Sequence, residues 1–215
     1  MAPTSPDPQA AADLAAATRR VIDLVRRSAA SPEQMRDAAA ALEAIARDLE
    51  PVAFAGPFMQ RGLEWTGELS TPEAPRDFAV FFPYSPFVGP RNPLAPPASF
   101  EIRDGRVFGR VRFTAAYVGP PQSVHGGVIA ATFDELLGST NLVHEVGGMT
   151  GTLTVRYKAP TPILTEIALE GWLDRVEGRK VYTRGEMRHE GRLTAEAEGI
   201  FIRGSVEQLS ATVAA

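Results

Sequence analysis

Apolar residues recur at helical spacing in the first fifty residues of the chain. A helix is expected over residues 10–29. Its apolar residues recur at spacings of three and four, and they are Leu14, Ala17, Val21 and Leu24. A second helix is predicted from Ser31, which suits an N-cap, with Pro32 in the first turn and Gln34 completing a capping box. Its repeat ends before Pro51 and comprises Met35, Ala38, Leu42, Ile45 and Leu49. Residues 1–50 therefore read as a helical arm with a narrow apolar seam.

Residues 51–98 lack such periodicity and are rich in Pro, Gly and Phe. Six of the eleven phenylalanines fall in this stretch. The run Phe81-Phe82-Pro83-Tyr84-Ser85-Pro86 cannot be a central strand, because proline donates no ladder hydrogen bond. We interpret residues 51–98 as a connecting segment. It either lines an apolar ligand tunnel or packs over a sheet.

From residue 99 the pattern becomes that of an antiparallel sheet around one helix. Asp104-Gly105 is expected to form a hairpin turn between strands over residues 99–103 and 106–113. Further strands are expected over residues 150–158, 163–175, 179–189 and 192–203. A helix over 126–142 is apolar on most sides, so it should be buried. Regular alternation would put Thr150 and Thr152 on one strand face. The predicted class is α+β, with the main domain over residues 99–205.

Composition and charge exclude several kinds of function. The chain has 215 residues and no cysteine, which rules out disulfide scaffolds, zinc–thiolate sites and thiol nucleophiles. Its net charge of −4 disfavours nucleic acid as the main partner, and the arm itself holds 6 basic against 8 acidic residues. No apolar run reaches the length of a membrane span, and the first residues do not resemble a signal peptide. We expect a cytoplasmic protein without membrane association.

The segment that carries candidate chemistry is His125-Gly126-Gly127 at the start of the buried helix. Free N–H groups at a helix N-terminus can polarise a carbonyl group and stabilise an oxyanion. Asp134 follows eight residues after Gly126, in an otherwise apolar helix where a carboxylate is costly to bury. Glu135 is expected to be its exposed neighbour, because adjacent residues diverge by about 100° around a helix. The sequence thus offers a carboxylate and a set of backbone donors.

These residues resemble the hot-dog fold thioesterases, in particular the phenylacetate-pathway (PaaI-like) acyl-CoA thioesterase group. The resemblance covers about residues 99–203 and rests on His-Gly-Gly, on the aspartate eight residues after its first glycine, and on the segment from Met149 to Pro160 with its Tyr-x-x-Pro ending. It implies a hot-dog fold, in which an antiparallel sheet wraps round a central helix. It also implies hydrolysis of an acyl-CoA, with coenzyme A entering as part of the substrate and with neither a metal nor another cofactor.

The resemblance also assigns roles by position. Asp134 would be the general base or a nucleophile, Thr150 would hold the attacking water, and the Gly126 N–H with His125 would form the oxyanion hole. Sites of this family lie between subunits, which implies a homodimer or a dimer of dimers. The substrate contacts that we expect are Gly127, Gln122, Thr152, Arg156, Lys158, Arg179 and Lys180. Relatives often carry an asparagine six residues before the histidine; this chain has Gly119 there, and Gln122 is the nearest amide.

Two other functions stay open on the sequence. One is a hot-dog enoyl-CoA hydratase or dehydratase, and the other is a non-catalytic acyl-CoA-binding or sensing protein that uses the arm for interaction. The two remaining histidines, His144 and His189, have no companion at ligand spacing and are read as structural. No Gly-x-Ser-x-Gly motif occurs, which disfavours a serine hydrolase of the α/β type.

Overall fold

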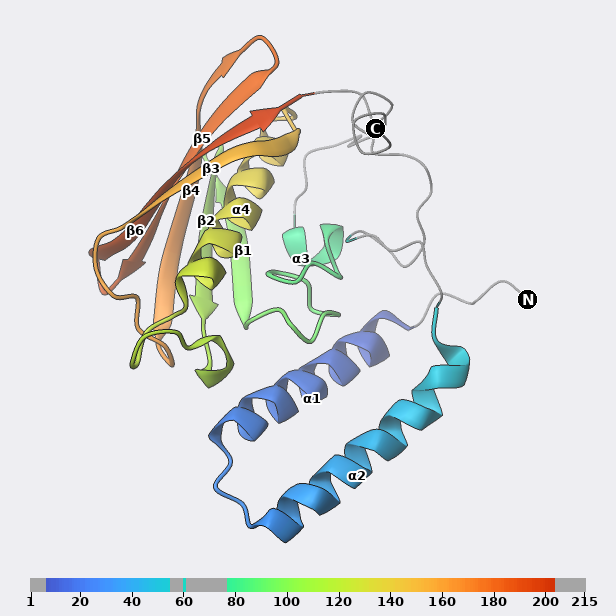
Figure 1. Ribbon diagram of the computed structural model, residues 1–215. Coiled ribbons are helices and arrows are strands. Elements are labelled where there is room, and N and C mark those ends of the chain that lie inside the picture. The colour runs from blue at the N-terminus through green and yellow to red at the C-terminus, as the bar shows by residue number, and fades with distance from the viewer. Residues whose placement is uncertain (1–6, 55–59, 61–76, 204–215) are drawn as a thin grey trace, which may run out of the picture.

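The computed structural model describes residues 7–54, 60 and 77–203. Two long helices stand apart from a sheet that curves round a third (Figure 1). The helices are α1 (Pro8–Arg27), α2 (Pro32–Leu49), α3 (Phe78–Phe81) and α4 (Gly126–Val143), with short 3₁₀ turns η1 (Glu50–Val52) and η2 (Ala115–Tyr117). The strands are β1 (Ala98–Arg103), β2 (Arg106–Arg112), β3 (Met149–Tyr157), β4 (Glu166–Glu177), β5 (Lys180–His189) and β6 (Arg192–Ile202).

The six strands form one antiparallel sheet in the order β1-β2-β4-β5-β6-β3. Consecutive strands β4, β5 and β6 pair as hairpins, whereas β3 crosses to the far edge and pairs with β6. Strand β3 runs along α4 at this edge (Figure 1). The predicted α+β class and the hot-dog arrangement are confirmed.

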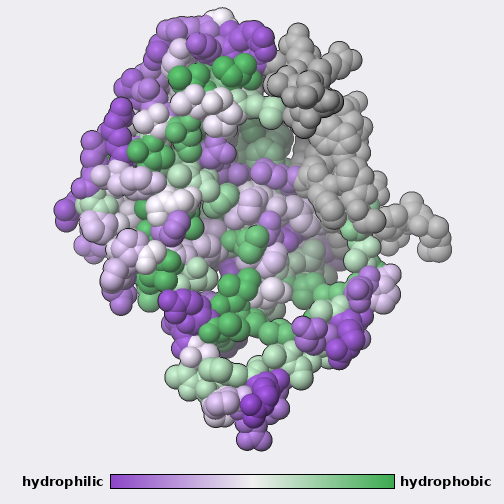
Figure 2. Space-filling model, viewed as in Figure 1, coloured by the Kyte–Doolittle hydropathy of each residue, from purple (hydrophilic) through white to green (hydrophobic). Residues whose placement is uncertain are grey.

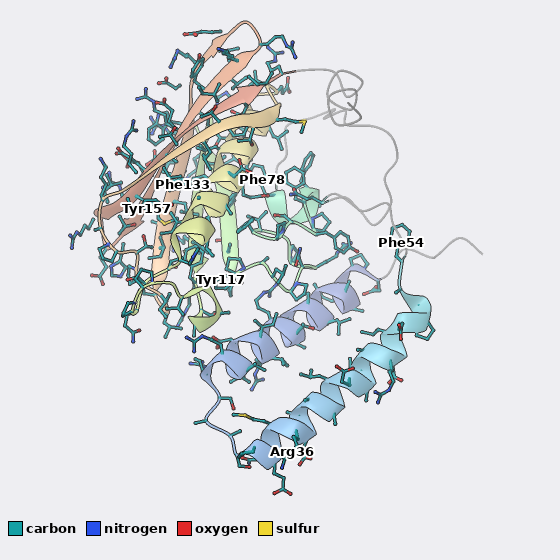
Figure 3. All side chains as sticks on the ribbon, viewed as in Figure 1. Arg36, Phe54, Phe78, Tyr117, Phe133 and Tyr157 are labelled. Atoms are coloured by element: carbon teal, nitrogen blue, oxygen red, sulfur yellow. The ribbon has the colours of Figure 1, made fainter. Side chains whose placement is uncertain are left out.

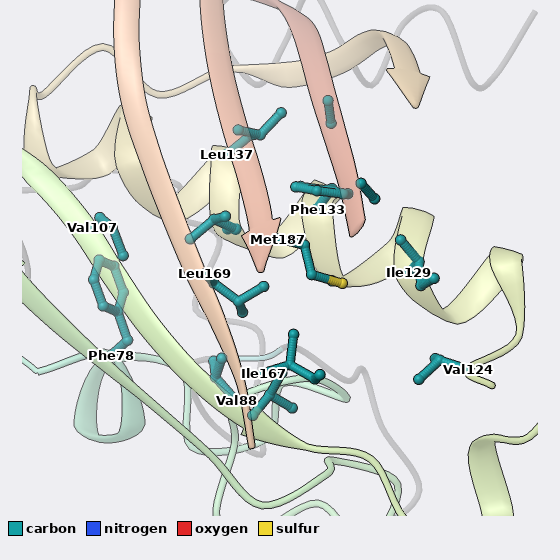
Figure 4. Packing of buried hydrophobic residues seen from close by; sticks show 14 of the residues in the cluster. Phe78, Val88, Val107, Val124, Ile129, Phe133, Leu137, Ile167, Leu169 and Met187 are labelled. Atoms are coloured by element: carbon teal, nitrogen blue, oxygen red, sulfur yellow. The ribbon is translucent and has the colours of Figure 1, made fainter. Parts of the chain in front are cut away.

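Helix α4 is buried against the concave face of the sheet. Its side chains Phe133, Leu136 and Leu137 have no exposed surface, and they meet apolar residues of β2, β4, β5 and β6 (Figure 4). The helix can lie this close because glycines replace side chains beneath it. A Cβ atom on Gly171 would come within 2.5 Å of Thr140 Oγ1, and one on Gly199 within 3.0 Å of Leu137.

Residues 77–97 form an ordered cover over β1 and one side of α4, although the sequence predicted no element within them. Phe78 is buried in the core and meets Phe100 of β1 edge-to-face, with ring centroids 5.9 Å apart. Ser85 is fully buried, and its hydroxyl oxygen accepts the N–H groups of Phe87 and Val88. Of the two alternatives for this stretch, the described part packs over the sheet. The rest of segment 51–98 lies mostly outside the described residues.

The arm consists of the two helices that the periodicity predicts, and they differ in how they are attached. Helix α1 lies against η2 and buries Ala15, whereas α2 buries no residue. The capping box of Ser31 and Gln34 forms as predicted. Within the described residues, no helix has the length and apolar character needed to cross a membrane.

Candidate functional site

The N-terminus of α4 is capped by the side chain of His125. The Gly127 N–H donates to His125 Nδ1 at 3.0 Å, while the His125 backbone N–H donates to the Tyr117 carbonyl at 2.9 Å. Because Nδ1 accepts a hydrogen bond, the neutral form of the ring carries its proton on Nε2. His125 is exposed. The Gly127 N–H, predicted to contact the substrate, is therefore already engaged within the chain.

Gly126 differs from its neighbour in that its N–H group has no acceptor among the described residues. Its carbonyl oxygen accepts the hydroxyl of Tyr157, the last residue of β3, at 2.9 Å. A helix N-terminus with one unused N–H and a fixed position has the properties of an oxyanion donor. Tyr157, which points toward α4 in Figure 3, was missed by the sequence reasoning because a long-range contact leaves no mark in local spacing.

The geometry of the loop before α4 explains why position 119 is a glycine and carries no side-chain amide. Gly119 donates its N–H to the Ser123 carbonyl at 2.9 Å, which folds the loop back on itself. A Cβ atom on Gly119 would lie 2.7 Å from the Cα of His125. Any side chain would displace the helix cap, so this loop geometry requires glycine. Gln122 is exposed on the same loop with a positive φ of 57°, and its carbonyl accepts the Ile163 N–H.

Asp134 and Thr150 lie together. The Thr150 hydroxyl donates to Asp134 Oδ1 at 2.7 Å, and the other carboxylate oxygen has no partner among the described residues. Asp134 is half-buried. One oxygen is thus held in place while the second stays available to bind water or to accept a proton.

The expectation that Thr150 and Thr152 share a strand face is wrong. Strand β3 bulges between them, so that Thr150 pairs with Phe201 and Thr152 with Ile200, which are adjacent on β6. Adjacent residues point to opposite faces of a sheet, and Phe201 is the buried one. The bulge therefore turns Thr150 toward α4 and Thr152 toward the outer face, away from Asp134.

Glu135 is half-buried, not exposed as predicted. Burial is the main cause that raises its pKa to about 7, the nearby Asp134 charge adds to the shift, and a hydrogen bond from the Ser85 side chain partly opposes it. Its Oε1 atom is buried without a hydrogen-bond partner. The divergence of about 100° from Asp134 suggested an exposed side for Glu135, but the cover formed by residues 77–97 reaches this side of α4 through Ser85.

Gly126 and Asp134 are too far apart in one chain to act on one carbonyl group. Eight residues at about 1.5 Å of helix rise separate them by roughly 12 Å along the axis. A water held by Asp134 and an oxyanion held by Gly126 would have to lie within about 3 Å of the same carbon atom. If both act, they come from different copies of the chain.

The predicted cations have other partners or are exposed in the described chain. Arg156 is exposed on the outer face of β3, and Lys158 forms a 2.9 Å ion pair with Glu196. Arg179 and Lys180 lie at the β4–β5 turn, where Arg179 Nε donates to the Arg203 carbonyl at 2.9 Å. None of these four is hydrogen-bonded to Asp134, Thr150 or Gly126, so their role as substrate contacts stays a prediction.

The two remaining histidines make single contacts. His144 Nε2 lies 2.7 Å from the Gly105 carbonyl, and His189 Nε2 lies 3.4 Å from Thr165 Oγ1. Across the ranges that the structure describes, no three His, Asp or Glu side chains gather as a metal site would require.

Comparison with known proteins gives consistent matches. Residues 122–196 match the family model described as thioesterase superfamily. A crystal structure of a thioesterase superfamily protein is 36% identical, with a TM-score of 0.77 over 93% of this chain and 94% of that chain. Among curated proteins, the acyl-coenzyme A thioesterase THEM4 of Xenopus laevis is 39% identical over 88 residues (40% of this chain, 39% of the relative), and THEM5 of Homo sapiens is 30% identical over 94 residues (43% and 38%). The chain thus spans about two fifths of the length of these curated relatives.

Proposed function

The chain belongs to the thioesterase superfamily, and on this basis we propose that it is an acyl-CoA thioesterase. The observation that supports this most directly is the pair Asp134–Thr150, in which a half-buried carboxylate is oriented by one hydrogen bond and keeps its second oxygen available. The curated relatives named acyl-coenzyme A thioesterases supply the substrate class.

In the proposed reaction Asp134 acts as general base. Its unbound oxygen takes a proton from water, and the water oxygen attacks the thioester carbonyl carbon. Thr150 holds the carboxylate in the orientation that this proton transfer needs. Collapse of the tetrahedral intermediate breaks the C–S bond and releases an acid and the thiolate of coenzyme A, which takes up a proton. A thioester is electrophilic enough for this chemistry to need one carboxylate and a few backbone donors.

The oxyanion of the intermediate would be stabilised by the Gly126 N–H, at the positive end of the α4 dipole. His125 supports this donor indirectly, because its ring occupies the Gly127 N–H and fixes the first turn. Given the separation along α4, we propose that Gly126 of one copy faces Asp134 of another, so that the active form contains at least two chains. An alternative role for Asp134, attack on the thioester as a nucleophile, uses the same free oxygen.

A hydrolysis screen with a thiol-reactive dye tests the proposal. The chain contains no cysteine, so the dye reports only released coenzyme A. The panel should contain short, long and aromatic acyl-CoA substrates, each tested with the wild type and with Asp134→Asn. We expect hydrolysis of at least one substrate and a loss of about 10²–10⁴-fold in the variant. Absence of hydrolysis across the panel, or equal rates for both proteins, would refute the assignment.

Single-turnover hydrolysis in ¹⁸O-labelled water separates the two roles of Asp134. With a general base, the label enters only the product acid. With a nucleophile, the Asp134 carboxylate displaces the thiolate and forms a mixed anhydride. Water attack on the Asp134 carbonyl carbon of this anhydride releases the product acid with an oxygen of Asp134 and leaves the label in the protein, whereas a trapped acyl-Asp134 adduct identifies the nucleophile if water attacks the acyl carbon.

A further inference from the structure

Helices α1 and α2 present an apolar surface that the described chain leaves uncovered. We propose that this surface, the arm interface, binds a second copy of the chain, with α2 of each copy packing against α1 of the other. The proposal concerns residues 8–49 and does not depend on the thioesterase activity.

Helix α1 uses only one of its faces to contact the body. Ala15 is buried, Arg19 donates to the Asn92 carbonyl at 2.9 Å, and Asp23 accepts the Ala115 N–H at 3.3 Å. These residues recur every fourth position and define the attached side. The apolar seam lies about 180° away, on the opposite side of the same helix, and its residues Leu14 and Leu24 are 48% and 47% exposed. The body therefore does not cover the seam of α1.

Helix α2 has no buried residue, although it is a complete helix of 18 residues. In proteins, most of the stability of an amphipathic helix comes from packing of its apolar face. Its seam residues are 41% to 51% exposed, which is far more than a packed helix face allows, and they are Met35, Leu42, Ile45 and Leu49. Their spacing of three and four is that of a helix that meets one facing helix. The apolar face of α2 is thus suited to packing against a helix, and no helix of the described chain covers it.

The two arm helices do not cover each other's seams. They lie side by side without packing along their lengths (Figure 1), and apolar residues gather where they leave a hollow between them (Figure 2). The connection is short and internally bonded: the Ala30 N–H donates to Ser28 Oγ at 3.2 Å, and the Ser31 N–H donates to Gln34 Oε1 at 2.9 Å. These two bonds fix the conformation of the connection between α1 and α2.

Charge favours a second copy as the occupant. Helix α1 contains four arginines and two aspartates, for a net charge of +2, whereas α2 contains four acidic residues and two arginines, for a net charge of −2. None of the α2 charges has an ion pair among the described residues. Two copies related by a twofold axis bring α2 of each chain to α1 of the other, which pairs opposite charges twice. The acidic α2 also disfavours an anionic membrane surface as the partner.

Cross-linking tests this arrangement, because the chain has no native cysteine. Full-length chains with Ala17→Cys and tagged chains with Leu42→Cys are refolded together and treated with a bismaleimide. The control mixture replaces Leu42→Cys by Ala40→Cys, which lies on the opposite side of α2. We expect the mixed cross-link to form several-fold more in the seam mixture. Equal yields in both mixtures would overturn the proposal.

A double variant distinguishes pairing between chains from closure within one chain. Ala17→Cys with Leu42→Cys in a single chain should give covalent dimers on oxidation; a product that contains only internally linked monomers would overturn the proposal. In parallel, Leu42→Glu with Ile45→Glu should speed amide hydrogen exchange in α2 several-fold and leave β5 unchanged. Ala40→Glu with Ala44→Glu is the matched control, and identical exchange in the two variants would contradict the arm interface.

Discussion

Helices α2 and α4 have the same length, 18 residues, and opposite relations to the rest of the molecule. Helix α4 buries eight of its residues, and α2 buries none. Helix α2 has the stronger local signals, with a capping box, a proline in its first turn and an acidic residue beside it. Helix α4 begins with two glycines and is stabilised mainly by the sheet around it. Local sequence thus specifies α2, whereas tertiary packing specifies α4.

The largest expected difference between the two helices follows from removing one apolar side chain from each. Phe133→Ala in α4 should lower the free energy of unfolding by about 3–5 kcal/mol, because its ring has no exposed surface. Leu42→Ala in α2, measured in dilute protein, should cost less than about 1 kcal/mol. Urea denaturation followed by tryptophan fluorescence measures both. Similar losses would mean that α2 is as strongly packed as α4.

A second prediction concerns the buried carboxyl of α4. The pKa of Glu135 is raised to about 7 in the folded protein, against an ordinary value of 4.5. Between these values the folded state binds a proton that the unfolded state does not. Stability should therefore fall as pH rises from 4.5 to 7, by up to about 3 kcal/mol, and be independent of this group above pH 7.

Glu135→Gln should remove this dependence. The measurement is the urea midpoint at several pH values, for the wild type and for the variant. Glu43→Gln on exposed α2 is the control and should leave the slope unchanged. A slope that persists in Glu135→Gln would assign it to other groups.

A third, smaller effect is expected at the start of α4. Tyr157→Phe removes the hydroxyl that bonds to the Gly126 carbonyl, which should cost about 1 kcal/mol of stability and lower kcat for hydrolysis. Tyr117→Phe removes an equivalent hydroxyl contact, to the Leu94 carbonyl at 2.7 Å, and is the matched control. It should cost similar stability without changing kcat. Equal kcat values for the two variants would mean that Tyr157 does not position Gly126.

The smallest effect on the whole protein is expected from the cap of α2. Ser31→Ala breaks the capping box and should destabilise the helix locally by about 1 kcal/mol, with no change in the unfolding of the sheet. Hydrogen exchange resolved by segment measures this, with faster exchange in α2 and unchanged exchange in β5. Faster exchange in both would show that α2 unfolds together with the body.

The sequence predicted the helices and strands well because each has a strong period or a clear boundary signal. The seam of α2, the turn at Asp104-Gly105 and the buried helix from Gly126 are examples. It also named the two residues that the structure brings together, Asp134 and Thr150. Their functional roles stay predictions until hydrolysis is measured.

What the sequence could not predict depends on contacts between distant segments. The bulge that separates Thr150 from Thr152 changes the face of one residue without breaking the alternation of the rest of β3. The environment of Glu135 includes a hydrogen bond from Ser85, fifty residues earlier, in a stretch without periodicity. The steric clash that a side chain at position 119 would make with His125 arises only in the folded loop, and local sequence does not show it.

Strand β3 is joined to α4 by a side-chain hydrogen bond near each of its ends, from Thr150 to Asp134 and from Tyr157 to Gly126. The strand is therefore attached to the helix at two separate points, one beside the carboxylate and one at the helix start. A single inserted or deleted residue between positions 150 and 157 would break at least one of these attachments, even if the sheet re-formed. Residues 144–148, which precede the strand, lie outside the segment between these two attachments. Protein engineers should therefore place new peptide in that loop and leave the strand intact.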